Sequence, residues 1–141
     1  MERKASAQWN GGLKDGHGTI SSASGALSET AYSFHTRFED GPGTNPEELI
    51  AAAHAGCFSM AFSAELGKAG MNPVSVATTA TATFEKTEAG FTITKIHLAT
   101  MAKVPDATKE AFDAAAAAAK VGCPISRVLK AEITLDAKLE A

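Results

Sequence analysis

The sequence predicts one α+β domain that spans residues 1–141, and three observations support this. Short segments separated by glycines fill the first forty residues and are typical of strands and turns. Residues 49–66 form one long segment that is apolar on nearly every side, which predicts a buried helix at the centre of the fold. No repeat or linker divides the chain, whose length suits one compact domain.

The N-terminal part is expected to form strands at residues 6–10, 19–22 and 32–38. A helix start follows. Asn45 is a favourable N-cap, Pro46 suits the first helical position, and Glu48 has the spacing of a capping box. Glycines after residue 66 end this helix.

The second half alternates apolar and polar residues in two segments around a glycine turn, which predicts an antiparallel hairpin. An alanine-rich segment then predicts a helix, and a Cys-Pro step predicts the start of a short one. The expected elements are strands 74–85 and 91–103, helices 108–120 and 124–130, and a last strand 133–139.

Composition and charge exclude several classes of function. The net charge of −3 gives no basic field for nucleic acid or for an anionic membrane surface. No stretch approaches about 20 uninterrupted apolar residues, so no membrane-spanning helix is expected. The start, Met1-Glu2-Arg3-Lys4, is not followed by the apolar core of a signal peptide. We therefore expect a cytoplasmic protein.

The chain has two cysteines, Cys57 and Cys123. Lasting disulfides are rare in the cytoplasm, so a structural bridge is not expected, and the alternative to reactive thiols is a pair of buried apolar ones. Cys57 lies about three turns inside the apolar helix, where burial would raise its pKa and make it inert. If Cys57 is reactive, a cation must lie beside it, and the candidates are His54 and Arg37.

Helical geometry separates the two glutamates at the start of this helix. Glu47 precedes Cys57 by ten residues, which places the two about 80° apart around the axis. Glu48 precedes it by nine residues, about 900° of rotation, and so faces nearly the opposite way. Glu47 is therefore the better candidate to hold a cation near Cys57, and Glu48 is better explained as a cap.

Cys123 stands just before Pro124, at the expected start of a short helix where backbone N–H groups favour an anion. Local context alone would make Cys123 the easier thiolate. It does not say which cysteine attacks first.

Residues 43–58, Gly-Thr-Asn-Pro-Glu-Glu-Leu-Ile-Ala-Ala-Ala-His-Ala-Gly-Cys-Phe, resemble the signature of the OsmC/Ohr family of osmotically inducible and organic-hydroperoxide-resistance proteins. Residues 122–131, Gly-Cys-Pro-Ile-Ser-Arg-Val-Leu-Lys-Ala, resemble its second cysteine motif. The resemblance covers essentially the whole chain and is closer to the OsmC branch, because the family arginine falls at Arg37. It implies the OsmC-like fold, with antiparallel sheets around a long buried central helix, in an intertwined homodimer.

The same resemblance implies a thiol peroxidase that reduces organic hydroperoxides in oxidative and osmotic stress defence. Cys57 would be the peroxidatic cysteine and Cys123 the resolving one, with Arg37 and Glu47 as the polar pair beside them. The products would be an alcohol, a Cys57 sulfenic acid and then a Cys57–Cys123 disulfide. An external dithiol, expected to be a dihydrolipoyl protein, would reduce the disulfide, and no cofactor, metal or haem would be needed.

Other interpretations stay open at this point. The histidines, at positions 17, 35, 54 and 97, lack zinc spacing, so a metal site is not expected. Trp9 is expected in the core, while Phe34, Phe38 and Phe58 could shape an apolar pocket. A redox sensor that oxidises once and a cysteine hydrolase that uses Cys57 with His54 are the alternative functions.

Overall fold

The computed structural model describes residues 1–140, which group into two compact units. The N-terminal unit is Met1–Leu49 and the C-terminal unit is Ile50–Ala141. Each unit contains its own three-stranded sheet. The expectation of a single domain stays a prediction.

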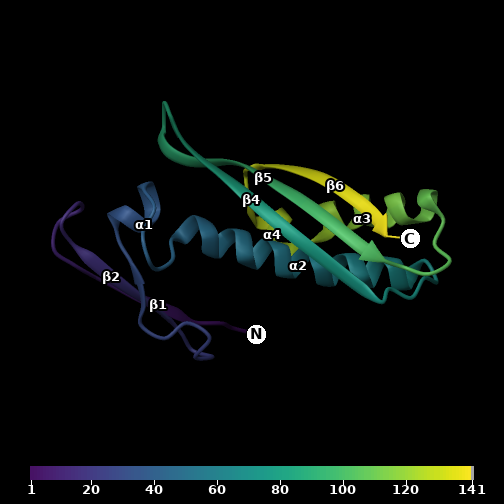
Figure 1. Ribbon diagram of the computed structural model, residues 1–141, viewed down its shortest axis with the longest axis horizontal. Helices are drawn as coiled ribbons and strands as arrows, with labels where there is room; N and C mark the ends of the chain where they lie inside the picture. Colours follow the sequence, from purple (N-terminus) through teal and green to yellow (C-terminus); the bar gives the residue numbers. More distant parts are fainter. Residues whose placement is uncertain (141) are drawn as a thin grey trace. The chain divides into compact units, whose positions relative to one another are not determined.

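The N-terminal unit begins with strands β1 (Ala5–Asn10), β2 (His17–Ser22) and β3 (Thr30–Tyr32), which pair antiparallel in that order (Figure 1). The first two strands were predicted. Gly18 is buried in β2, and a Cβ there would lie 2.4 Å from the Tyr32 ring. The absence of a side chain lets the Trp9 and Tyr32 rings approach to 5.4 Å between centroids.

Helix α1 (Phe34–Phe38) corrects the strand predicted over residues 32–38. Ser33 accepts a hydrogen bond from the Thr36 backbone at 3.3 Å, and the Thr36 hydroxyl accepts one from the Ser33 backbone at 2.8 Å. This reciprocal capping box ends β3 and begins a helix, so a local side-chain signal overrides the alternating pattern. Arg37 consequently lies on a helix rather than on a strand.

Helix α2 (Pro46–Lys68) begins where the sequence predicted. The Asn45 side chain accepts the Glu48 backbone N–H at 2.8 Å and donates to the Thr36 carbonyl at 2.8 Å. One residue therefore caps α2 and attaches its start to α1. Gly43, at φ +117°, lets the segment before α2 lie close to β3, because a Cβ at this position would lie 2.4 Å from the Ala31 carbonyl oxygen.

In the C-terminal unit, strands β4 (Ser75–Thr87) and β5 (Gly90–Lys103) form the predicted antiparallel hairpin. The predicted helices and last strand are also present. They are α3 (Lys109–Gly122), α4 (Pro124–Val128) and β6 (Glu132–Glu140). However, β6 pairs parallel to β5, so the expectation of wholly antiparallel sheets is wrong. The reason is that α3 and α4 carry the chain back to the start of β5, as parallel pairing requires.

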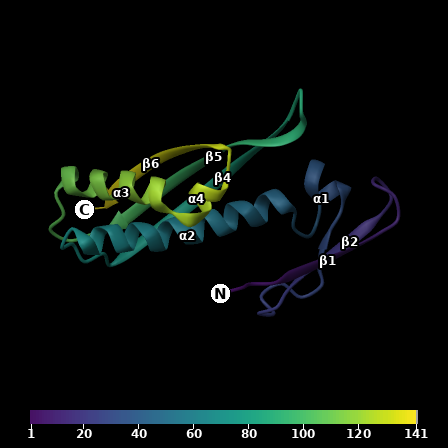
Figure 2. The same ribbon diagram turned by 180° about the vertical axis from the view of Figure 1, so that it is seen from behind.

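The helices of this unit cover one face of its sheet. Figure 1 looks onto β4, β5 and β6, and Figure 2, from behind, looks onto α3 and α4. Between the layers, Phe58, Phe62 and Leu66 of α2 are fully buried with Ile96 and Leu98 of β5. The core therefore fixes which side of α2 faces the sheet.

Within residues 1–140, part of the opposite side of α2 stays uncovered. Ala52, Ala53, Gly56 and Met60 are exposed, and Met60 has 78% of its surface open. By length and composition alone α2 could cross a membrane, although only 22% of its most apolar window is buried within the chain. The expectation of a helix buried all round is thus met on one side only.

Candidate active site

The structure brings the two cysteines together. Cys57 lies in the middle of α2 and Cys123 lies between α3 and α4, with their sulfur atoms 3.0 Å apart. Both are free thiols. Two residues that are 66 positions apart in sequence are thus placed where one disulfide can form after a small approach.

The backbone around Cys123 is fixed on both sides. Its N–H donates to the Ala119 carbonyl at 2.9 Å, which closes α3, and its carbonyl accepts from the Arg127 N–H at 3.0 Å, which opens α4. Pro124 occupies the first turn of α4, where it loses no hydrogen bond. The cysteine is therefore held at a sharp junction of two helices.

The two thiols differ in exposure. Cys123 is fully buried within the chain, whereas Cys57 is half-buried. A peroxide in solvent therefore reaches Cys57 more readily. This difference favours Cys57 as the first thiol to react, which local sequence context did not indicate.

Burial raises the pKa of Cys57, and the hydrogen bond with the Cys123 thiol also raises it. A hydrogen bond from the Ile125 backbone acts in the opposite direction and lowers it. Cys123 is the N-cap of α4, as the sequence predicted, but its side chain makes no capping hydrogen bond there. The backbone amide of the first turn instead stabilises the Cys57 sulfur, since the Cys123 side chain is directed at Cys57.

His54 does not form a pair with Cys57. It is fully buried, and its Nε2 lies 2.8 Å from the Ser126 hydroxyl oxygen of α4. Burial lowers its pKa, so the ring is neutral near pH 7 and is not the cation that Cys57 needs. Across residues 1–140, its other ring nitrogen has no hydrogen-bond partner. The hydrolase interpretation, which needs a His54–Cys57 pair, loses its geometric basis.

Arg37 and Glu47 form an ion pair in the N-terminal unit. The Arg37 Nε and Nη2 atoms donate to Glu47 Oε1 at 3.1 and 2.8 Å. Glu47 is buried, whereas Glu48 is exposed and its backbone N–H is capped by Asn45. The second carboxylate oxygen of Glu47 is buried and has no partner within residues 1–140.

An apolar pocket of about 290 Å³ adjoins Arg37 in the same unit. Its walls are Trp9, Leu13, Tyr32, Ser33, Phe34, Arg37 and Phe38. The predicted lining role of Phe34 and Phe38 is confirmed, whereas Phe58 lies in the core of the C-terminal unit. Trp9 is 36% exposed rather than in the core, because β1 is exposed along its whole length.

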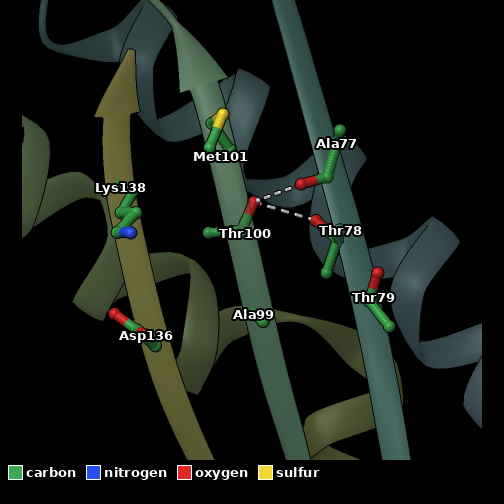
Figure 3. A pocket seen from close by; sticks show the side chains of 8 residues that line it. All are labelled: Ala77, Thr78, Thr79, Ala99, Thr100, Met101, Asp136 and Lys138. Carbon is green, nitrogen blue, oxygen red and sulfur yellow. Dashed lines mark hydrogen bonds between the residues drawn. The ribbon is translucent and has the colours of Figure 1, made fainter.

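A larger depression of about 410 Å³ lies on the outer face of the β4–β5–β6 sheet (Figure 3). Small side chains such as Ala77, Thr79 and Ala99 line it, with Met101 and Lys138 at one end. It contains neither thiol and no histidine, so volume alone does not identify the reactive site here. In the part of the chain that the structure describes, no group of three or more His, Cys, Asp or Glu side chains is placed to hold a metal.

Sequence reasoning missed two contributors to the thiol site, Ser126 and the Ile125 amide. A signal for Ser126 was present, since it follows Cys123 by three residues just as His54 precedes Cys57 by three. No sequence pattern could identify the amide, because its direction depends on how α4 packs against α2.

Comparison with known proteins gives the same family. A sequence model described as OsmC-like protein matches residues 39–138. The chain is 52% identical to Peroxiredoxin OsmC of Escherichia coli (strain K12), over 100% of this chain and 99% of that protein.

Two crystal structures show the same fold. OhrB, an organic hydroperoxide resistance protein of Bacillus subtilis, matches with a TM-score of 0.69 at 24% identity, over 97% of this chain and 98% of that one. An OsmC-like protein from Mycoplasma pneumoniae matches with a TM-score of 0.76 at 15% identity, over 100% and 99% of the two chains.

Proposed function

Since the chain belongs to the OsmC-like protein family, we propose that it is a thiol peroxidase that reduces organic hydroperoxides to alcohols through Cys57 and Cys123. The observation that carries this proposal is the 3.0 Å approach of two free thiols in a chain 52% identical to a peroxiredoxin over its full length. Defence against oxidative and osmotic stress is the role that such an activity would serve.

In the first step the Cys57 thiolate attacks the O–O bond of the hydroperoxide. A sulfur–oxygen bond forms, the O–O bond breaks, and the alkoxide leaves as an alcohol after taking a proton. Cys57 becomes a sulfenic acid. Its partial exposure supports its role as the peroxidatic cysteine, and the Ile125 backbone hydrogen bond stabilises the attacking thiolate.

In the second step Cys123 acts as the resolving cysteine. Its sulfur attacks the sulfenic sulfur of Cys57, a disulfide forms, and the hydroxyl leaves as water with the thiol proton. The short distance between the sulfurs supports this step. An external dithiol, such as a dihydrolipoyl protein, then reduces the disulfide and restores both thiols.

Arg37 and Glu47 complete the proposed catalytic set. The guanidinium would supply the cation that a thiolate with a raised pKa requires, and the buried carboxylate of Glu47 would fix its direction through two charge-assisted hydrogen bonds. The aromatic pocket beside Arg37 would hold the organic part of the hydroperoxide. The larger a hydroperoxide's apolar group, the more surface this pocket could remove from water.

The proposed assembly is an intertwined homodimer in which the two units of each chain belong to one OsmC-like domain. The uncovered apolar side of α2, which includes Ala53, Gly56 and Met60, supports association with a second copy. We place the dimer in the cytoplasm, where both thiols would stay reduced between cycles.

Steady-state turnover tests the proposal. Cumene hydroperoxide and tert-butyl hydroperoxide are supplied with dihydrolipoamide or with thioredoxin, and alcohol release is followed over many cycles. A peroxidase turns over repeatedly and Cys57→Ser abolishes the activity. A redox sensor would oxidise once and stop, and Cys57→Ser activity at the wild-type rate would overturn the assignment of Cys57.

A further inference from the structure

Two neighbouring side-chain contacts join α2 to the start of α4. Cys57 contacts Cys123 at 3.0 Å and His54 contacts Ser126 at 2.8 Å. The second contact lies three residues before the first on α2 and three residues after it on α4, so the two segments run antiparallel here. Three helical residues correspond to about 4.5 Å along the axis, so the two contacts are adjacent.

The His54–Ser126 contact joins a fully buried histidine to a half-buried serine. His54 is fully buried, and its ring has one hydrogen-bonded nitrogen within the described residues. A hydrogen bond in such surroundings is stronger than in water, and losing it would leave a buried polar atom unsatisfied. The buried His54 ring therefore favours the position of the Ser126 hydroxyl in which this hydrogen bond forms.

The two contacts respond differently to oxidation. When Cys57 becomes a sulfenic acid, its sulfur gains an oxygen, and its contacts with Cys123 and with the Ile125 amide must rearrange. The His54–Ser126 hydrogen bond contains no atom that reacts. It can therefore hold α4, a helix of only five residues, in place while the thiol contact changes.

We propose that the His54–Ser126 hydrogen bond is a positioning device that keeps the Cys123 thiol against Cys57 during disulfide formation. This rests on the proposed peroxidase function and adds a determinant of its second step. The sulfenic acid has two fates. Attack by the Cys123 sulfur gives the disulfide and water, whereas a second hydroperoxide molecule transfers an oxygen to the Cys57 sulfur, giving a sulfinic acid and an alcohol. The hydrogen bond favours the first fate.

The test compares Ser126→Ala with Ser59→Ala. Ser59 lies on α2, as His54 does, and its hydroxyl donates to Thr78 of β4 at 2.8 Å. Ser59→Ala therefore removes a side-chain hydrogen bond of α2 that does not involve α4. Rapid mixing with cumene hydroperoxide measures Cys57 oxidation and then disulfide formation. Mass spectrometry of Cys57 measures the sulfinic fraction in excess peroxide.

Ser126→Ala is expected to slow disulfide formation about fivefold, the change that corresponds to one hydrogen bond of about 1 kcal/mol, and to raise the sulfinic fraction. Ser126→Thr keeps a hydroxyl and should recover most of the rate, whereas Ser59→Ala should form the disulfide at close to the wild-type rate. In a double-mutant cycle, His54→Phe should add little to Ser126→Ala, because both remove the same bond.

If Ser126→Ala forms the disulfide at the wild-type rate, the positioning role is wrong. It is also wrong if Ser59→Ala slows disulfide formation as much as Ser126→Ala does. In both cases the wild type still forms a disulfide, so the peroxidase function stands. A wild type that forms neither sulfenic acid nor disulfide would contradict the proposed function itself, and the positioning role with it.

Discussion

At the scale of single residues, the central question is how a cysteine inside an apolar helix becomes a nucleophile. Burial and the neighbouring thiol raise the pKa of Cys57, and the backbone of Ile125 compensates only in part. A thiolate in such a place needs a positive charge. We propose that Arg37, fixed by Glu47, supplies this charge, since His54 is neutral and bonded to Ser126.

Replacing Arg37 should therefore raise the pKa of Cys57 further. In a Cys123→Ser background, ultraviolet titration of the thiolate in Arg37→Gln should show a midpoint about one pH unit higher, as the loss of an attraction of about 1.4 kcal/mol requires. Since the raised pKa leaves less thiolate near pH 7, the rate with peroxide should fall and should recover as pH rises. Arg127→Gln is the matched control, because Arg127 is an exposed arginine of α4. If the titration curves of Arg37→Gln and Arg127→Gln coincide, Arg37 does not lower the pKa of Cys57.

Residues of the site were predictable to different degrees. The family resemblance named Cys57 and Cys123, which the structure brings together, and Arg37 and Glu47, which it pairs with each other. The place of that pair beside the thiols is still a proposal. Trp9 could not be placed in a pocket wall, because whether a strand is covered depends on its neighbours rather than on its own pattern.

At the scale of elements, the start of α2 separates two glutamates that are adjacent in sequence. Glu47 is buried and accepts two hydrogen bonds from Arg37. Glu48 is exposed and lies at the capped end of the helix. The different directions that helical rotation predicts for Glu47 and Glu48 are thus accompanied by different burial and different partners.

Glu47→Gln should consequently lower kcat/KM about tenfold, the effect of weakening one charge-assisted interaction, whereas Glu48→Gln should change it little. Steady-state kinetics with cumene hydroperoxide measures both. A larger loss in Glu48→Gln than in Glu47→Gln would contradict the assignment.

The cap of α2 predicts an effect on stability. Asn45→Ala removes the bond to the Glu48 N–H and the bond to the Thr36 carbonyl, and should reduce the free energy of unfolding by about 1–2 kcal/mol. Urea unfolding measures this. Asn72→Ala, at an exposed position beyond the helix, should have an effect near zero. Equal destabilisation by the two changes would show that the cap is not specific.

Elements with strong local signals were predicted well, whereas those set by pairing were not. The Asn45-Pro46 start and the β4–β5 hairpin depend on nearby residues, and both appear where expected. The direction of β6 depends on where α3 and α4 return the chain, which no pattern within β6 encodes.

At the scale of the whole molecule, α2 presents one side to its own sheet and leaves the other apolar and open. Phe58, Phe62 and Leu66 lie on the buried side, and Met60 is 78% exposed on the other. Exposed apolar surface of this kind supports the proposed association of two chains. In the proposed dimer, a second copy of the chain covers this side of α2.

Met60→Lys should therefore weaken the proposed dimer, because a charge would be buried without a partner. Light scattering coupled to size-exclusion chromatography measures the mass in solution. Met101→Lys is the control, since Met101 is 46% exposed on the outer face of the sheet. A Met60→Lys protein as dimeric as the control would contradict this use of α2.

The central claim is that Cys57 reacts first and Cys123 then closes a disulfide with it. The intact mass of the protein after one equivalent of cumene hydroperoxide tests this most directly. We expect that the wild type loses two hydrogen atoms, that Cys123→Ser gains one oxygen atom on Cys57, and that Cys57→Ser is unchanged. An oxygen atom gained on Cys123 in the Cys57→Ser variant, with none on Cys57 in Cys123→Ser, would reverse the roles and contradict the account.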